Sequence, residues 1–292
     1  MLTPEIFEQV LINGLSLSAI YVLVALGFTL LFGIMRVVNF AHGAFAMLGG
    51  FALFYLYGSF KLPYLLAVPL AALIVATGSL VFEVLVFRWF YQKMFQSMIG
   101  LLGLNMAIVF SAVLIWDVYE RSIPPAFNGL ISFRGLMLPT DRLVIICIAF
   151  LVLIAFWLFI TRSRHGLAMR AAAQDVQIAE TQGVNSAFIY RLAFFIAIFM
   201  AALAGGLYAQ TYSLSPFIGE ETLMVAFVVV VLGGMGSIPG AALGGVILGF
   251  AQSFISTFYG SAASSFTSFG MVIVLLIFRP WGLLGVPESE HL

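Results

Sequence analysis

Long apolar runs, separated by short polar breaks, make up most of the chain. A helix that crosses a membrane needs roughly 20 mostly apolar residues. The runs occupy residues 7–35, 43–58, 64–87, 97–116, 143–160, 187–212, 222–234, 241–259 and 262–278. The second and seventh are short for a complete crossing. The pattern predicts an all-α, polytopic integral membrane protein with about 8–9 transmembrane helices, one or more of them broken or short.

The composition agrees with a lipid environment. Hydrophobic residues form 63% of the 292 residues and charged residues only 8%, whereas a soluble domain carries about a quarter charged residues. The formal net charge of zero leaves no basic surface for nucleic acid, which is not expected as a partner. The single cysteine forms no internal disulfide. Because no long polar linker divides the chain, we expect one membrane domain over residues 1–292.

Basic residues indicate the orientation of the chain. They follow the first, third, fifth and last apolar runs, and cytoplasmic loops are enriched in Lys and Arg. The residues concerned are Arg36, Arg88, Lys93, Arg162, Arg164, Arg170 and Arg279. Placing them inside predicts a multi-pass protein with its N-terminus outside and its C-terminus in the cytoplasm.

A polar insert, "TRSRHGLAMRAAAQDVQIAETQGVN", separates the fifth and sixth runs. Residues 167–181 are rich in good helix formers. Gly183 stands where a helix would end in the left-handed conformation, and Asn185 is suited to cap the next helix. We therefore expect residues 162–185 to form a cytoplasmic loop that contains a helix.

Four residues of this insert recur at every fourth position and would share one helical face. They are Ala171, Asp175, Ala179 and Gly183. Three of them are small, so this face would admit the close approach of another protein. The alternative is an ordinary amphipathic helix that lies on the membrane surface. The pattern alone leaves both readings open.

A second polar break, "MRVVNFAHGAFAMLGG", starts at Met35. Asn39 and His42 are three positions apart and would lie on one helical face. Gly43 then permits a broken helix, whose free backbone groups need protein or water in a membrane. The alternative is that the glycines only allow close helix packing and that His42 is a hydrogen-bonded structural residue.

A third break lies between the seventh and eighth runs. Interrupted helices in both halves of a transporter point to its pathway. We therefore predict that the translocation pathway is lined by Asn39, His42, Gly43, Gly233, Gly234, Gly236, Ser237 and Pro239.

The polar motifs resemble those of the branched-chain amino acid permeases of ABC importers. The segments "MRVVNFAHG", "RHGLAMRAAAQDVQIAETQGVN", "VVLGGMGSIPGAALGGVILG" and "FRPWGLLG" follow the family's order from the first run to the last. The resemblance is to the shorter permease subunit. It implies a heterodimer with a second permease, two ABC ATPase subunits and a soluble binding protein that delivers substrate. It also implies that ATPase coupling uses Gly166, Arg170, Ala171, Asp175, Ala179 and Gly183.

The match has departures. Ala44 stands where the family usually has an acidic residue, and the end of the third run reads Glu83-Val84 and Arg88-Trp89. These changes leave a urea or short-chain amide permease as an alternative. Glu83 itself would pair with Arg88, bind the coupling subunit or cap a helix.

Other function classes fit the sequence less well. The two lysines, Lys61 and Lys93, lie in no phosphate-binding loop. No catalytic set, metal-ligand spacing or cofactor motif is present, so we expect a non-enzymatic subunit, with ATP hydrolysed by separate subunits. A secondary transporter would favour intramembrane acids, and the runs hold almost none besides Glu83. A passive channel would have no use for the polar insert.

Overall fold

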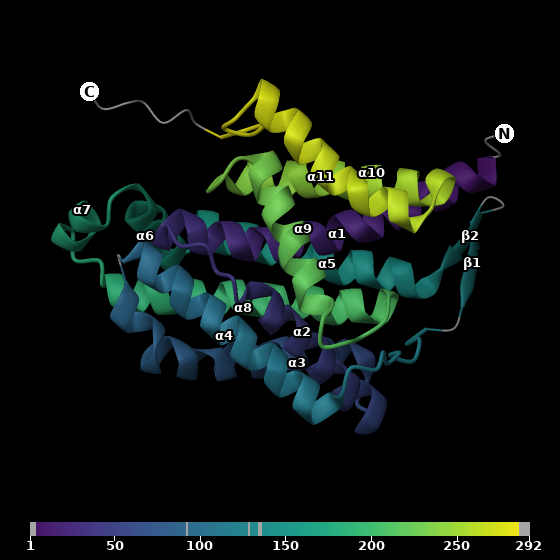
Figure 1. Ribbon diagram of the computed structural model, residues 1–292, viewed down its shortest axis with the longest axis horizontal. Helices are drawn as coiled ribbons and strands as arrows, with labels where there is room; N and C mark the ends of the chain where they lie inside the picture. Colours follow the sequence, from purple (N-terminus) through teal and green to yellow (C-terminus); the bar gives the residue numbers. More distant parts are fainter. Residues whose placement is uncertain (1–3, 92, 128, 134–135, 286–292) are drawn as a thin grey trace.

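The computed structural model describes residues 4–91, 93–127, 129–133 and 136–285, and it is built almost entirely of helices (Figure 1). The helices are α1 (Pro4–Met35), α2 (His42–Leu53), α3 (Tyr64–Leu85), α4 (Met94–Trp116), α5 (Thr140–Arg162), α6 (Arg164–Gln174), α7 (Val176–Thr181), α8 (Ser186–Thr211), α9 (Ile218–Gly233), α10 (Ile238–Tyr259) and α11 (Ser261–Phe278). A π-helical turn, Phe54–Ser59, extends α2, and a short 3-10 turn, Phe87–Phe90, follows α3. The strands β1 (Leu130–Phe133) and β2 (Leu136–Pro139) form an antiparallel hairpin.

The prediction of an all-α, polytopic membrane protein is confirmed. Within the described part of the chain, seven helices are long and apolar enough to cross a membrane: α1, α3, α4, α5, α8, α10 and α11. The helices α2 and α9 have only 12 and 16 residues, and they correspond to the two runs expected to be short.

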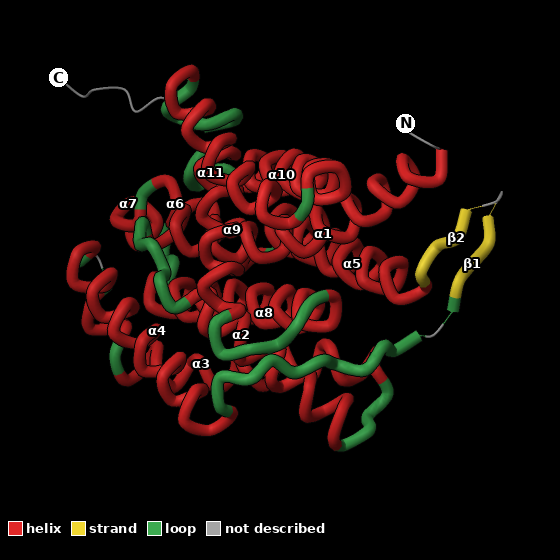
Figure 2. Tube along the Cα trace, turned by 45° about the vertical axis from the view of Figure 1, so that its right-hand side comes forward, coloured by secondary structure: helices red, strands yellow, loops and turns green. Residues whose placement is uncertain are grey.

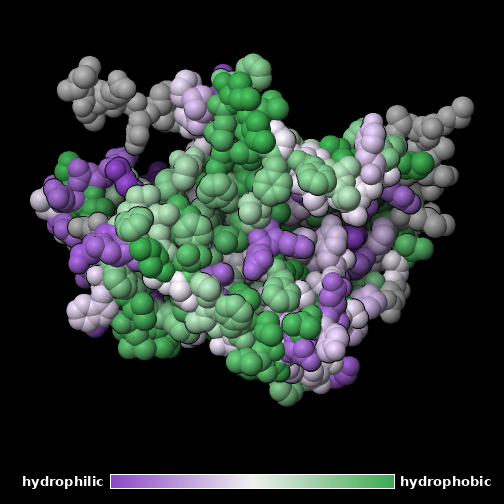
Figure 3. Space-filling model, in the orientation of Figure 1, coloured by the Kyte–Doolittle hydropathy of each residue, from purple (hydrophilic) through white to green (hydrophobic). Residues whose placement is uncertain are grey.

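The long helices lie side by side, and the polar elements lie at the two ends of the bundle. In Figure 1, α1, α5, α8 and α10 run along the horizontal axis, with α6 and α7 at one end and the β-hairpin at the other. Figure 2 shows the same arrangement after a turn of 45°. The start of α1 lies at the end that carries the β-hairpin. Apolar surface predominates between the ends in the space-filling view (Figure 3), as expected for a bundle surrounded by lipid.

The central helix α1 packs closely against α10 because small residues line their contact. A Cβ added at Gly249 would lie 2.5 Å from the backbone nitrogen of Ser18, and one added at Gly245 would lie 2.7 Å from the side chain of Val22. Small residues at such contacts let helix backbones approach in a membrane, where dispersion replaces the hydrophobic effect as the driving force.

The short helices α2 and α9 begin inside the bundle. His42, the first residue of α2, has its Nε2 atom 3.0 Å from the carbonyl oxygen of Val24. Val24 lies about three turns before the end of α1, so α2 starts well below the surface. The first turn of α9 contacts that of α2, because a Cβ added at Gly43 would lie 1.9 Å from the carbonyl oxygen of Gly219. From there α9 runs steeply across the long helices (Figure 1).

The segment after α11 folds back onto the junction of α9 and α10. The amides of Leu283 and Leu284 donate to the carbonyls of Leu232 and Gly233, each at 2.9 Å. Gly282 has φ +81, a conformation that favours glycine. These contacts join three helix ends into one packed unit.

Candidate functional site

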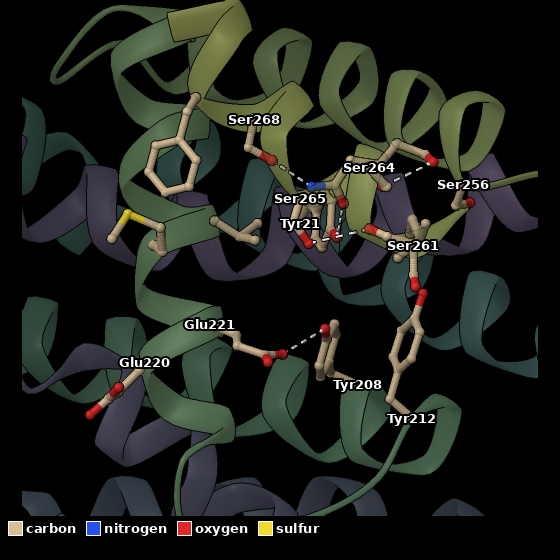
Figure 4. A pocket seen from close by; sticks show the side chains of 15 residues that line it. Tyr21, Tyr208, Tyr212, Glu220, Glu221, Ser256, Ser261, Ser264, Ser265 and Ser268 are labelled. Carbon is tan, nitrogen blue, oxygen red and sulfur yellow. Dashed lines mark hydrogen bonds between the residues drawn. The ribbon is translucent and has the colours of Figure 1, made fainter. Parts of the chain in front are cut away.

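An open pocket of about 530 Å³ lies where α8 and α9 face α10 and α11 (Figure 4). Its lining is unusually polar for a membrane protein. The polar side chains around it are Tyr21, Tyr208, Tyr212, Glu220, Glu221, Gln252, Ser256, Ser261, Ser264, Ser265 and Ser268. Its size falls within the roughly 300–1,000 Å³ typical of small-molecule sites.

A chain of hydrogen bonds forms one wall of this pocket. The phenol of Tyr21 donates to Oε1 of Gln252, and Nε2 of Gln252 donates to Oγ of Ser268 at 2.5 Å. These residues come from α1, α10 and α11, so the relay fixes three helices with respect to one another. Both ends of the half-buried Gln252 amide thereby have a hydrogen-bond partner.

The opposite wall carries a carboxylate. Tyr208 of α8 donates to Oε2 of Glu221 in α9 at 3.3 Å. Nearby, burial raises the pKa of the Tyr212 phenol; Arg142 opposes this rise and Glu221 adds to it. The side chain of Glu221 points towards Tyr208, whereas that of Glu220 points away from it (Figure 4).

The position of these two glutamates is the most informative feature of the pocket. Both lie in the first turn of α9, which begins at Ile218. Both are exposed, and Figure 3 shows a hydrophilic patch over α9 within an otherwise apolar face. An ionised side chain within a bilayer faces a water-filled cavity or a partner because hydrocarbon solvates it poorly. This face is therefore unsuited to direct contact with lipid.

The sequence reasoning missed these carboxylates. It started the seventh run at residue 222, so both acids fell outside the run, whereas the structure includes them in the first turn of α9. Helix propensity and hydropathy gave no reason to begin α9 earlier. A usable signal is the position of both acids at a helix start, where the helix dipole favours negative charge.

The first predicted pathway residues lie behind the pocket, not in its lining. Asn39 and His42 are 2% and 0% exposed. Oδ1 of Asn39 accepts from the amide of Ala41 at 3.1 Å, while His42 contacts Val24 and the edge of the Phe28 ring. In the described structure Nδ2 of Asn39 and Nδ1 of His42 have no protein partner. Together they hold the broken start of α2.

The second predicted set forms the turn between α9 and α10. Gly234 and Gly236 have φ +103 and +83, which explains why glycine occupies both positions. Ser237 caps α10 by accepting from the amide of Gly240 at 3.1 Å, and Pro239 lies in the first turn of that helix. The backbones of Gly233 and Gly240 are packed together, since a Cβ on either would lie 2.2 Å from the other.

The polar insert is not the single helix that was expected. The first helix, α6, ends at Gln174, and Asp175 is extended, with φ −154 and ψ 115. Its Oδ1 accepts from the amide of Ile178 at 2.9 Å and caps α7. The prediction that Ala171, Asp175, Ala179 and Gly183 share one helical face is therefore wrong. Asp175 and Gly183 are exposed, whereas Ala179 is buried. An Asp at this position ends one helix and starts another because its side chain competes for backbone amides.

Other expectations for the insert are confirmed. Gly183 has φ +83, and Oδ1 of Asn185 caps α8 by accepting from the amide of Phe188 at 3.0 Å. Gly166 is buried at the corner between α5 and α6, where an added Cβ would lie 2.3 Å from the carbonyl oxygen of Phe159. Ala171 is half-buried.

One basic residue of the insert meets the second predicted pathway set. Arg170 and Gly236 line the same small cavity of about 50 Å³, together with Gly33 of α1. The polar insert and the turn between α9 and α10 thus border one cavity.

The sequence model that describes the "branched-chain amino acid transport system / permease component" family matches residues 10–278. The chain belongs to this permease family. The permease is 35% identical to the Pseudomonas aeruginosa protein named high-affinity branched-chain amino acid transport system permease protein BraD, over 98% of this chain and 99% of that one. It is 32% identical to Escherichia coli LivH, named as a permease protein of the same kind of system, over 97% of each chain.

Two further likenesses place the permease more broadly. It is 25% identical to the E. coli permease protein LivM, covering 98% of this chain and 73% of that one. In a solved structure, titled PsaBC from Streptococcus pneumoniae in complex with Fab, one chain matches with a TM-score of 0.53 and 12% identity, over 93% of this chain and 92% of that one. The latter likeness concerns the fold alone.

Glu83 of the permease has a partner that the sequence reasoning did not consider. Its carboxylate is fully buried and lies 3.1 Å from Nε of Arg191 in α8. The phenol of Tyr91 donates to its other oxygen. Burial and this contact with Glu83 raise the pKa of the Tyr91 phenol. Arg88, one of the three alternatives considered for Glu83, has its guanidinium carbon 5.0 Å from the centre of the Trp89 ring.

The described part of the permease holds no cluster of three His, Cys, Asp or Glu side chains able to hold a metal ion. The relatives are named as transport permease proteins. The pocket offers hydroxyl, amide and carboxylate groups beside an apolar wall, which are groups that can recognise a small molecule.

Proposed function

We propose that this permease is a transmembrane subunit of an ABC importer and forms part of the translocation pathway for branched-chain amino acids. One observation carries the proposal: Glu220 and Glu221 lie exposed on the apolar face of α9. A second permease packed against this face, with a water-filled path between the two subunits, gives these carboxylates the polar surroundings that lipid denies them. The match to both LivH and LivM supports a heterodimeric arrangement.

The energy for import comes from two separate ATPase subunits that dock on residues 162–185. Ile178 supports this role because it is 63% exposed at the tip of the insert, and Leu167 is 60% exposed. These two side chains supply apolar contact area for a protein partner. ATP binding would bring the two ATPases together and move the docked helices, and Arg170 of α6 borders the same cavity as Gly236 in the turn between α9 and α10.

The orientation proposed for the chain is N-terminus outside and C-terminus in the cytoplasm of a bacterial inner membrane. The position of α6 and α7 at the end opposite the start of α1 supports it (Figure 1). The chain then passes through the membrane about nine times, with α2 and α9 as interrupted crossings beside the seven long helices. Residues 1–292 form one permease domain, and a soluble binding protein delivers substrate to the outer end.

The predicted pathway residues have a supporting role in this scheme. Asn39, His42 and Gly43 hold the start of α2 against α9, and the turn from Gly233 to Pro239 forms the inner joint of α9. The pathway itself follows the polar pocket between α9 and α11.

Uptake into proteoliposomes tests this function. The permease is reconstituted with its partner permease and ATPases, and labelled leucine is supplied with the binding protein. We expect uptake to require ATP and to persist when an ionophore dissipates ion gradients. Uptake by the permease alone, driven by an ion gradient, would show a secondary transporter instead. ATP-driven uptake of urea without leucine would assign the amide-permease alternative.

A further inference from the structure

The geometry points to a substrate site within this chain: we infer that the pocket between α8, α9, α10 and α11 binds a free amino acid, whose α-ammonium pairs with Glu221. The inference rests on the proposed function and adds to it the binding groups. The pocket is then a substrate-binding site on the pathway rather than an unselective water-filled passage.

Glu221 is prepared for a cationic group. One of its oxygens accepts from Tyr208 at 3.3 Å, which holds the side chain in place. A carboxylate has about four acceptor sites, and an ammonium brings three donors. Among the described residues, no basic side chain lies within salt-bridge distance of Glu221. The ion pair in this part of the chain joins Glu83 to Arg191 instead. The carboxylate therefore has acceptor capacity left over and points towards the cavity (Figure 4).

The facing wall offers a donor to the carboxylate of the same amino acid. Oγ of Ser268 accepts from Gln252 at 2.5 Å, and Gln252 in turn accepts from Tyr21. Because the serine oxygen is used as an acceptor, its own hydroxyl proton is available to a carboxylate. Ser268 is 5% exposed, so this donor is held in a defined direction.

Apolar side chains complete the site. Leu17, Met224, Val225 and Phe269 line the same pocket. They provide a surface for an aliphatic side chain, whereas the carboxylate and the hydroxyl group fix the polar end. Most small-molecule sites combine an apolar lining with a few placed polar groups in this way. The combination selects a zwitterion with an apolar tail over urea, which has neither a cationic group nor a tail.

Substrate protection of an introduced cysteine tests the inference directly. The permease has one cysteine, Cys147, which is exposed, so M224C is made in a C147S background. The whole complex, without binding protein, is placed in nanodiscs and labelled with a thiol-specific methanethiosulfonate reagent. We expect millimolar leucine to slow labelling of M224C. We expect 4-methylpentanoate, which lacks the ammonium, and urea to leave the rate unchanged. Y119C in the outer loop, where Tyr119 is 72% exposed, is labelled without protection.

Charge removal identifies the carboxylate responsible. E221Q in the M224C background should raise the leucine concentration for half-protection by about tenfold or more, since hydrogen bonds to charged groups contribute about 1.5–3 kcal/mol. E220Q, which removes the same charge from the side chain that points away, should produce a smaller change. An unchanged labelling rate without leucine shows that E221Q keeps the pocket intact.

The outcomes separate the site from the function. Equal protection of E221Q and its parent, or equal protection by 4-methylpentanoate, overturns the assignment of Glu221. If the wild-type complex imports leucine with ATP but M224C is never protected, the pocket assignment fails while the importer function stands. If the complex imports no leucine at all, the proposed function itself fails.

Discussion

Arg191 and Glu83 join α8 to α3 through an ion pair of 3.1 Å, although 108 positions separate them in the chain. The carboxylate is fully buried, whereas 45% of the Arg191 side chain is exposed. Tyr91 donates to the same carboxylate from the connection between α3 and α4. Three elements that are distant in sequence therefore meet at one charge near the end of the bundle that carries α6 and α7.

Removing the arginine should destabilise the fold. R191M leaves the buried Glu83 carboxylate without its cation, and an unsatisfied buried group costs about 1–3 kcal/mol of stability. The loss of stability is smaller than for a fully buried ion pair because the Arg191 side chain is partly exposed. Thermal unfolding in detergent measures the change. The double variant E83Q/R191M should recover much of the loss, since no buried charge remains. R88M is the matched control, because Arg88 contacts Trp89 and not Glu83; equal losses in R88M and R191M would contradict the assignment.

Asp175 acts as a helix cap, so its hydrogen bond matters more than its charge. D175A removes the acceptor for the amide of Ile178 and should lower the stability of α7 by about 1 kcal/mol. We expect ATPase activity stimulated by the loaded binding protein to fall, because the docked segment is no longer ordered. D175N and D175S keep a capping oxygen and should retain most of the stimulation. If D175N is as defective as D175A, the charge itself is recognised by the ATPase.

The contact between the starts of α2 and α9 should tolerate no side chain. G43A places a Cβ 1.9 Å from the carbonyl oxygen of Gly219, so the two helices must separate, and overpacking of this kind costs typically about 1–3 kcal/mol or more. We expect less monodisperse protein by size-exclusion chromatography and a lower unfolding temperature. G78A in α3 is the control, because nothing lies within 4 Å of its added Cβ. That change should be neutral or stabilising by up to about 1 kcal/mol.

The segment that follows α11 should be sensitive to a substitution that is small in volume. In G282A the new Cβ would lie 2.5 Å from the backbone of Gly234, in addition to the strain of φ +81. G260A carries a similar strain at φ +86 but meets nothing within 4 Å. The difference in unfolding temperature between the two variants therefore isolates the steric contact. Equal temperatures would show that the return of the chain onto α9 contributes little.

Much of the helical architecture follows from hydropathy alone. The runs at residues 64–87 and 187–212 correspond closely to α3 and α8, because a membrane-crossing helix must satisfy its backbone internally and be apolar along its length. The caps at Gly183 and Asn185 were also predictable, since each depends on one residue and its own backbone.

The features that failed depend on contacts between distant segments. The partner of Glu83 lies in α8, and helical spacing from Glu83 gives no information about that helix. The break at Asp175 depends on whether its side chain bonds to the backbone or extends to solvent, a competition that a regular four-residue spacing conceals. The acidic start of α9 was lost because the apolar run was taken to begin after Glu221.

The return of the chain onto the α9–α10 turn sets a mechanical limit on the transport cycle. Leu283 and Leu284 are bonded to the last residues of α9, and α10 starts a few residues later. Moving the end of α9 away from the segment after α11 would break both backbone hydrogen bonds, so we expect these two to move together. We expect α9 to move more easily at its other end, where Gly219 packs against Gly43. Among the described residues, no backbone hydrogen bond joins α2 to α9 there.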